Sequence, residues 1–430
     1  MATETRGVAR RIGLNNSAAL IVAASLGNAL EFFEILVYGY FAVTLSKVFF
    51  PSADETVSLL VTLGTFGVTF LARPVGALWL GAYGDRAGRK KALTLSIALM
   101  TAGSGVMAVM PGYDSIGVLA PILVIAARLL QGFSVGGEFA ASTSFLVEHR
   151  PDRAGFFASW QWSSQGLAAL LATGFGVVLT GTMSANQLQS WGWRIPFAVG
   201  LLVGPVGYYI RSHLDETPAF LAEEAPRQPL RDVVAQQWDR LLLSLGVAVI
   251  SNSSQYMLVY MPTYATRELG LSPTASFVAA ALAAALQTVV VPFAGIFADK
   301  VGQTRIMMGA ALLFISTAYP VFARLQAHPS LSTFVLTVCW IGLLKSCYSG
   351  ALPSLMASLF PTRTRVTGLS LSYNVSVLIF GGFAPFYATL LIGLTGSKLA
   401  PSYYVTATAA ISLATLVLLR RRFRGGLQRA

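Results

Sequence analysis

The stretch GAYGDRAGRKK, residues 81–91, carries the clearest sign of the fold, because it recurs as GIFADKVGQTR at residues 295–305. Both copies follow the pattern G-x-x-x-D-basic-x-G-x-x-basic, and each lies between two long apolar runs. A recurrence at equivalent positions of two halves is much harder to produce by chance than either copy alone. Two similar halves with a site between them are the design of alternating-access transporters.

The composition indicates a membrane protein. Of the 430 residues, 55% are hydrophobic and only 11% are charged, and the mean hydropathy is +0.65. A soluble chain would carry about 25% charged residues. Apolar runs of about 20 residues predict an all-α integral membrane protein with twelve transmembrane helices in two pseudo-symmetric six-helix bundles. The expected spans are 17–46, 57–83, 92–111, 116–147, 156–181, 193–211, 240–265, 274–298, 305–324, 331–358, 365–393 and 402–421.

One substantial hydrophilic stretch, after the sixth span, divides the chain. We expect an N-terminal bundle at 1–211, a cytoplasmic linker at 212–239 and a C-terminal bundle at 240–430. The amphipathic end of the linker favours either a helix along the membrane surface or a flexible tether, and both interpretations stay open.

The basic residues indicate the orientation. With the N-terminus inside, 22 of the 30 Lys and Arg residues fall in cytoplasmic segments. Five fall outside and three within spans. The outer five are Lys47, Arg194, Arg267, Arg324 and Lys398. This positive-inside pattern predicts that both termini are cytoplasmic. The net charge of +12 therefore reflects topology, and no nucleic-acid partner is expected.

The remaining chemistry argues against an enzyme or a metal site. Cys339 and Cys347 lie eight residues apart on one predicted helix, beyond disulfide reach. His149, His213 and His328 form no ligand cluster, and no nucleophile–base motif is present. The apolar run after the basic N-terminus is too long for a signal-peptide core. We expect a transporter without metal or cofactor.

The paired loops, the six-plus-six arrangement and the central linker resemble the major facilitator superfamily. RLLQGFSVGGEFAAS (128–142), followed by FLVEHRPDRAG, resembles the signature of its metabolite:proton symporter branch. Further stretches resemble the citrate and tricarballylate proton symporters: GNALEFFEILVYGYFA (27–42), SWQWSSQ (159–165), WGWRIPF (191–197) and VTGLSLSYN (366–374). The resemblance implies alternating access in a bacterial inner membrane by a protein that functions as a monomer.

Charged residues at bilayer depth are costly and mark a pathway or a buried pair. On a helix at 100° per residue, Arg128, Gln131, Glu138 and Ser142 share one stripe, which must face a cavity or a protein neighbour. Arg73 of the second span should lie at the depth of Glu138. We interpret Arg73 and Glu138 as a structural or gating ion pair, with a direct substrate role as the alternative.

Arg128 is the candidate substrate ligand, because its planar fork holds a carboxylate with two hydrogen bonds. The alternative is a permanent structural salt bridge. Glu31 and Glu34 lie on one face of the first span, and two close carboxylates in a low dielectric are candidate proton carriers, with Glu138 as a third. Arg128 would pair with one of these carboxylates when the site is empty, and with the substrate once that carboxylate is protonated. Where this chain has Glu34, the family stretch usually has Asp.

Lys345, in the tenth predicted span, is a second candidate cation for a substrate with several carboxylates; its alternative is an ammonium capped by carbonyl groups or a carboxylate. Polar groups at mid-depth complete the candidate substrate site. They are Asn28, Gln161, Gln165, Asn252, Gln255, Tyr256, Tyr348, Tyr373 and Asn374.

The resemblance implies that the acid of the loop motif latches the cytoplasmic side shut. The second copy has Gln303 where a basic residue is common, so we expect its latch to be weaker. The candidate gating residues, besides Arg73, are Asp85, Arg86, Arg89, Asp299, Arg305 and Arg365, the last as a possible partner of the first copy.

The sequence thus predicts proton-coupled symport of a small organic anion, most simply citrate or a related tri- or dicarboxylate. One alternative is proton-coupled uptake of an osmolyte such as proline or betaine, which would need an aromatic cage for a quaternary ammonium. The other is a sodium-coupled carboxylate carrier.

Overall fold

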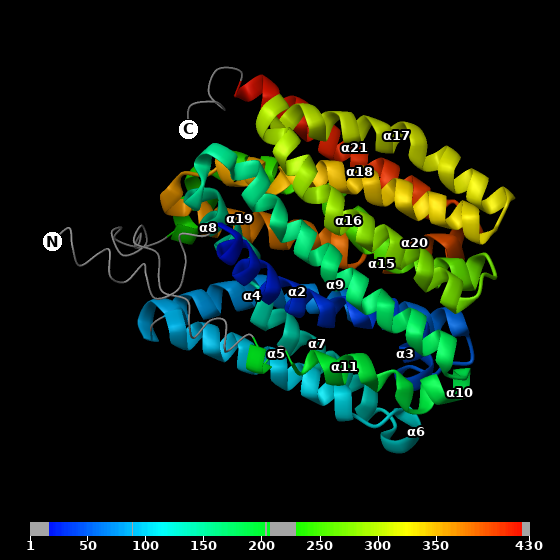
Figure 1. The fold of residues 1–430 in the computed structure, drawn as a ribbon. Coiled ribbons are helices and arrows are strands. Elements are labelled where there is room, and N and C mark those ends of the chain that lie inside the picture. Colours follow the sequence, from blue (N-terminus) through cyan, green and yellow to red (C-terminus); the bar gives the residue numbers. More distant parts are fainter. Residues whose placement is uncertain (1–16, 88, 203, 207–228, 424–430) are drawn as a thin grey trace.

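The structure is a computed structural model that describes residues 17–423 except 88, 203 and 207–228. Every regular element in these residues is helical, and the long helices lie roughly side by side in one bundle (Figure 1). The first described helix begins, and the last ends, at the same end of the bundle. We call this the terminal end and the other the far end.

The first half of the chain forms these helices: α2 (Ser17–Tyr40), α3 (Ala42–Phe49), α4 (Glu55–Ala87), α5 (Arg89–Val109), α6 (Tyr113–Ile116), α7 (Leu119–Val135), α8 (Glu138–His149), α9 (Ala154–Thr182), α10 (Ala185–Gln187) and α11 (Arg194–Gly200). Two short segments complete it: the 3₁₀ turn η1 (Pro151–Arg153) and the π-helical η2 (Leu188–Gly192). The side chains at the loop end of α4 lie outside the described residues.

The second half forms these helices: α14 (Pro229–Gln236), α15 (Trp238–Glu268), α16 (Pro273–Val301), α17 (Gln303–Ala327), α18 (Leu331–Ser358), α19 (Thr362–Ser376), α20 (Ala384–Thr395) and α21 (Ala400–Arg422). The π-helical segment η3 (Val377–Gly382) joins α19 to α20. The described end of the expected linker is α14, which packs on α19 and α15.

Among the described residues, nine helices are long and apolar enough to span a membrane, and the bent pair formed by α2 and α3 makes ten. The apolar part of α5, Thr94–Val109, is shorter. The expected sixth span is described only in part, by α11 and the residues near it. This is an all-α, multi-pass membrane protein.

Three expected spans are not continuous α-helices. The first bends by 69° between Tyr40 and Ala42, the fourth passes through Gly136 and Gly137 between α7 and α8, and the eleventh passes through η3. Gly136 and Gly137 keep right-handed helical dihedrals, and Leu119–Glu148 forms one apolar span.

Small residues bring α4 and α7 into backbone contact. A Cβ added at Gly132 would lie 1.8 Å from the carbonyl oxygen of Thr69, and one at Gly136 would lie 2.1 Å from that of Arg73. The spacing of these glycines is the small-xxx-small pattern of close helix pairs in membranes. It brings the polar side chains of the two helices together.

The two halves meet along several helix pairs, among them α9 with α16 and α18, α2 with α15, α8 with α19, and α4 with η3 and α20. Figure 1 shows α2 and α9 in the middle of the bundle, between the helices of the first half and those of the second. Some polar side chains of the paired helices, such as Gln255 of α15 and Gln287 of α16, therefore bond at the interface between the halves.

Candidate functional site

Arg128 lies at the centre of the first half and is completely buried. Its Nε donates a hydrogen bond to Thr69 Oγ1 (3.0 Å), and Nη1 donates to Gln131 Oε1 (2.8 Å). Its guanidinium lies over the ring of Tyr38, 4.5 Å from the centroid. Nη2 has no partner among the described residues. Arg128 is thus positioned by neutral groups and keeps a donor available.

Gln131 connects Arg128 to Glu34. Its Nε2 donates to Glu34 Oε2 (3.3 Å) and to Ser104 Oγ (3.2 Å). The other carboxylate oxygen, Oε1, packs directly against Gly200: a Cβ atom added to Gly200 would lie 1.1 Å from it. Oε1 has no hydrogen-bond partner among the described residues. The carboxylate of Glu34 therefore points toward α5 and α11 inside the first half, and Gln131 joins it to Arg128 instead of a direct ion pair.

Arg73 lies almost fully buried over aromatic rings, 4.4 Å from the centroid of Phe70 and 5.6 Å from that of Phe32. Its Nε and Nη2 have no described partner. No ion pair within the described part of the chain joins it to Glu138. Glu138 begins α8, and one of its carboxylate oxygens lies 3.6 Å from the position of a Cβ on Gly27. The expected pairing of Arg73 with Glu138 therefore stays a prediction.

Lys345 of α18 is completely buried at the interface between the halves. Its Nζ donates to Gln255 Oε1 of α15 and lies 4.5 Å from the ring centroid of Trp162, which belongs to α9 of the first half. In the described residues no carboxylate pairs with it. Lys345 is thus held by an amide and an aromatic face. Both are neutral, so neither cancels the charge of an ammonium at this position.

Several of the expected polar ligands are buried with unused hydrogen-bonding groups. Tyr256 packs edge-on against Phe66 and Phe70, the rings beneath Arg128 and Arg73. The groups without a described partner are both amide atoms of Gln161 and of Gln165, Asn252 Oδ1, Tyr256 OH and Trp162 Nε1. This cluster makes the centre of the bundle polar, as the lining of a small-molecule site needs.

Other expected ligands have partners within the protein. Asn28 donates to the backbone of Gln161 (3.0 Å) and to Ser164 Oγ (2.6 Å), and so ties α2 to α9. The hydroxyl of Tyr348 donates to the carbonyl of Val247 (2.6 Å), inside the second half. These two positions support the site's walls. Glu31 is buried on α2, one turn before Glu34.

Tyr373 and Asn374 join the halves. The Tyr373 ring stacks on Phe139 with centroids 3.7 Å apart, and Asn374 Nδ2 donates to the carbonyl of Gly136 (2.6 Å). The break between α7 and α8 frees this carbonyl from its helix. Asn374, which the sequence predicts as a substrate ligand, thus bonds across the interface between the halves in this structure.

The terminal end is closed by contacts between the halves. Asp299, at the end of α16, accepts hydrogen bonds from the N–H groups of Gly155 (2.7 Å) and Phe156 (3.0 Å) at the start of α9. Arg365 of α19 pairs with Glu148 of α8 at 2.6 Å. Within the described part of the chain, Arg305 donates to the carbonyl of Val301 (3.1 Å) in its own half. The acid of the second loop copy therefore joins the two halves at the terminal end, and its role as a latch stays a prediction.

Three expected gating residues lie outside what the structure describes. The side chains of Asp85, Arg86 and Arg89 belong to the undescribed stretch around residue 88, so their pairing stays a prediction. At the far end Arg267 pairs with Glu55 across the halves. With both ends joined, the central cluster is enclosed.

Sequence reasoning missed the neutral groups that orient the charges. Thr69 and Tyr38 hold Arg128, and Trp162 holds Lys345. Trp162 lies within the quoted stretch SWQWSSQ, and Glu148 lies within FLVEHRPDRAG. The quoted motifs could therefore have pointed to Trp162 and Glu148 as candidate site residues. Nothing in the sequence pattern indicated the proximity of Gly200 to Glu34.

Comparison with protein families confirms the fold and the class. Residues 19–239 match the family described as "Sugar (and other) transporter", and residues 243–429 match the "Major Facilitator Superfamily". The chain belongs to the major facilitator superfamily. It is a membrane transporter, and its relatives include members of the metabolite:proton symporter branch.

Curated relatives align over almost the whole chain. The citrate-proton symporter of Salmonella typhi is 36% identical over 412 residues, which cover 94% of each protein. That of Klebsiella pneumoniae is 34% identical and covers 95% of this chain and 93% of the relative. The proline/betaine transporter of Escherichia coli K12 is also 34% identical, covering 93% of this chain and 83% of the relative.

Solved structures show the same fold at low identity. The proton:xylose symporter XylE bound to 6-bromo-6-deoxy-D-glucose superposes with a TM-score of 0.76 at 14% identity, covering 95% of this chain and 96% of that chain. A partially occluded, inward-open form of XylE from E. coli gives 0.70 at 15%, covering 95% and 98%.

Proposed function

We propose that this transporter carries a small organic anion together with protons, and that the anion is citrate or a related tri- or dicarboxylate. One observation carries the proposal. Arg73, Arg128 and Lys345 are buried at the centre, and none is paired with a carboxylate in the described residues. Buried charges are normally paired, and a polycarboxylate would supply the missing partners.

The acidic residues near this centre support coupling to protons. Glu31, Glu34 and Glu138 equal the three cations in number, so the centre is neutral when all six groups are charged. A proton on one carboxyl group leaves a net positive charge that an anion can neutralise. Binding of the proton and of the anion therefore favour one another, as symport requires.

The distribution of the cations over both halves supports a substrate with more than one carboxylate. Arg73 and Arg128 belong to the first half and Lys345 to the second, where it reaches Trp162 of the first half. An anion that engages both sets would draw the halves together around it. Two relatives named citrate-proton symporters agree with this assignment.

A proline or betaine carrier is the second candidate, because relatives with that name align at 34% identity. A quaternary ammonium needs free aromatic faces. Here Tyr38, Phe70 and Trp162 already lie beneath the chain's own cations. The central rings therefore favour an anion over betaine. A sodium-coupled carboxylate carrier remains the third candidate.

The proposed orientation follows from the basic residues. The terminal end would face the cytoplasm of a bacterial inner membrane, where the latch at Asp299 opens to release substrate. The far end would face outward. A single chain contains both halves and would function as a monomer, exposing the centre alternately to each side.

The test is uptake of labelled citrate into proteoliposomes under an imposed inward proton gradient. Arg128→Ala should abolish uptake, while Arg324→Gln, which removes an exposed charge outside the centre, should retain it. Uptake that collapses with a protonophore supports proton coupling. Uptake that needs a sodium gradient, or saturable betaine uptake without citrate uptake, would contradict the proposal.

A further inference from the structure

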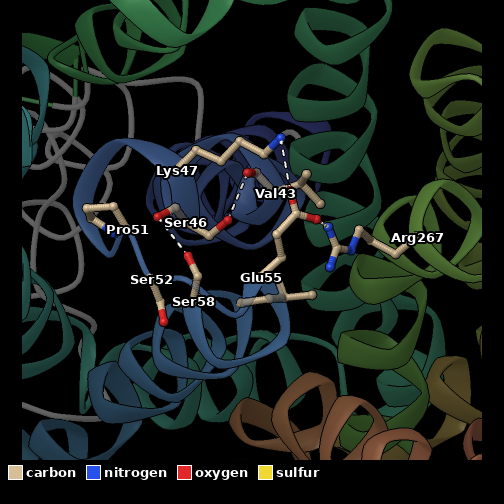
Figure 2. Close-up of a pocket in the computed structure, with 9 residues that line it drawn as sticks. Val43, Ser46, Lys47, Pro51, Ser52, Glu55, Ser58 and Arg267 are labelled. Atoms are coloured by element: carbon tan, nitrogen blue, oxygen red, sulfur yellow. Dashed lines mark hydrogen bonds and ion pairs between the residues drawn. The ribbon is translucent and has the colours of Figure 1, made fainter.

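A solvent-reached cavity of about 190 Å³ lies at the far end, where α3 and α4 of the first half meet the end of α15 of the second (Figure 2). Three charged side chains converge on it: Lys47, Glu55 and Arg267. Three serines, Ser46, Ser52 and Ser58, also line the cavity. Pockets for drug-sized ligands start at about 300 Å³, so this cavity suits a smaller molecule.

The single carboxylate in the cavity is shared by two cations. Lys47 Nζ lies 3.7 Å from Glu55 Oε1, and Arg267 Nη1 donates to Glu55 Oε2. Glu55 is 61% exposed, Lys47 45% and Arg267 25%. Exposed ion pairs contribute only about 0–1 kcal/mol. Another carboxylate can therefore replace that of Glu55 at little cost.

The positive charge of this cavity stands out against its side of the protein. Of the 30 Lys and Arg residues, five fall on the side away from the termini, and two of those five line the cavity. The side chains that line the cavity provide two bases and one acid, while Asp54 and Glu268, the chain neighbours of Glu55 and Arg267, do not line it. The two lining bases attract an anion that enters the cavity.

We propose that Lys47 and Arg267 form an outer capture site, in which a carboxylate of the incoming substrate replaces that of Glu55. This inference rests on the proposed function. Arg267 would hold the carboxylate with two parallel hydrogen bonds and Lys47 would hold it as a point charge. Because the cavity is reached by solvent while the halves are joined, capture precedes opening of the far end.

The experiment measures KM and maximal rate of citrate uptake for four variants in right-side-out and inside-out membrane vesicles. Arg267→Gln and Lys47→Gln should each raise the KM about two- to fivefold, and Glu55→Gln should lower it by a similar factor. Arg324→Gln is the control that removes a charge on the same side outside the cavity. These changes in KM should become smaller at high salt. They should be absent in the vesicles that present substrate to the terminal end.

The signs separate capture from a simple latch. A latch would make Glu55→Gln and Arg267→Gln change the KM in the same direction, because both break the same ion pair. That result, or unchanged KM values in all three variants with active wild-type protein, would overturn the outer capture site alone. Absence of carboxylate uptake by the wild-type protein would overturn the proposed function and the capture site together.

Discussion

Lys345 and Trp162 join the two halves of the protein: the ammonium of one half lies 4.5 Å from the ring centroid of the other. A cation over an indole face is held without being neutralised. The contact therefore places the Lys345 side chain at the interface without a carboxylate partner among the described residues. Because it joins the two halves, we expect it to break when they separate.

Lys345→Gln should raise the KM for citrate at least about tenfold, because a hydrogen bond to a charged group contributes about 1.5–3 kcal/mol. Trp162→Phe keeps a ring with a weaker face and should cost about two- to tenfold. The measurement is concentration-dependent uptake in proteoliposomes. A Lys345→Gln variant with wild-type KM would show that this ammonium does not meet the substrate.

Gly200→Ala should impair proton coupling, because its Cβ would lie 1.1 Å from the Oε1 atom of Glu34 and displace the carboxylate. We expect proton-driven accumulation to fall about tenfold or more, since overpacking costs about 1–3 kcal/mol. Gly174→Ala is the matched control, as its Cβ meets nothing within 4 Å. Equal accumulation in the two variants would exclude a role for the position of Glu34.

Asp299→Asn should loosen the terminal end. The substitution keeps the size of the side chain but removes the charge that accepts two N–H groups at the start of α9, where a helix N-terminus favours an anion. The accessibility of a cysteine placed in the central cluster to a reagent from the terminal end should rise about tenfold. Arg305→Gln, whose bond stays within one half, should change it little; an equal rise in both would refute the latch.

Gly132→Ala should lower thermal stability in detergent. Its Cβ would lie 1.8 Å from the backbone oxygen of Thr69, which cannot move without separating α4 from α7. We expect a loss of about 1–3 kcal/mol, visible as a lower midpoint of thermal unfolding than that of Gly174→Ala. Because Thr69 also holds Arg128, transport should fall in parallel. An unchanged midpoint would show that the two helices can adjust.

Asn374→Ala tests the contact that the sequence did not predict. Removing the donor to the carbonyl of Gly136 should weaken closure of the terminal end and raise substrate leak down its gradient by about two- to tenfold. The readout is efflux from preloaded proteoliposomes. If the KM for uptake rises while efflux stays unchanged, Asn374 is a substrate ligand, as first expected.

The sequence by itself determined the class, the family and the all-α, multi-pass nature of the protein. Long apolar runs leave few structures other than spanning helices, since backbone groups in lipid must bond within their own segment. The repeat at 81–91 and 295–305 indicated two halves, and the rarity of charges within spans singled out Arg73, Arg128 and Lys345. The class follows from composition and from the length of the apolar runs, while the family follows from the resemblance of the quoted motifs.

Only the tertiary structure decided which of these charges meet. The break between α7 and α8 at Gly136 and Gly137 leaves the carbonyl of Gly136 to accept a hydrogen bond from Asn374. Gln131 lies between Arg128 and Glu34, and Trp162 reaches Lys345 from the other half. Contacts such as these join residues far apart in the chain through side-chain directions and glycine-sized gaps, which helical periodicity along a single span does not contain.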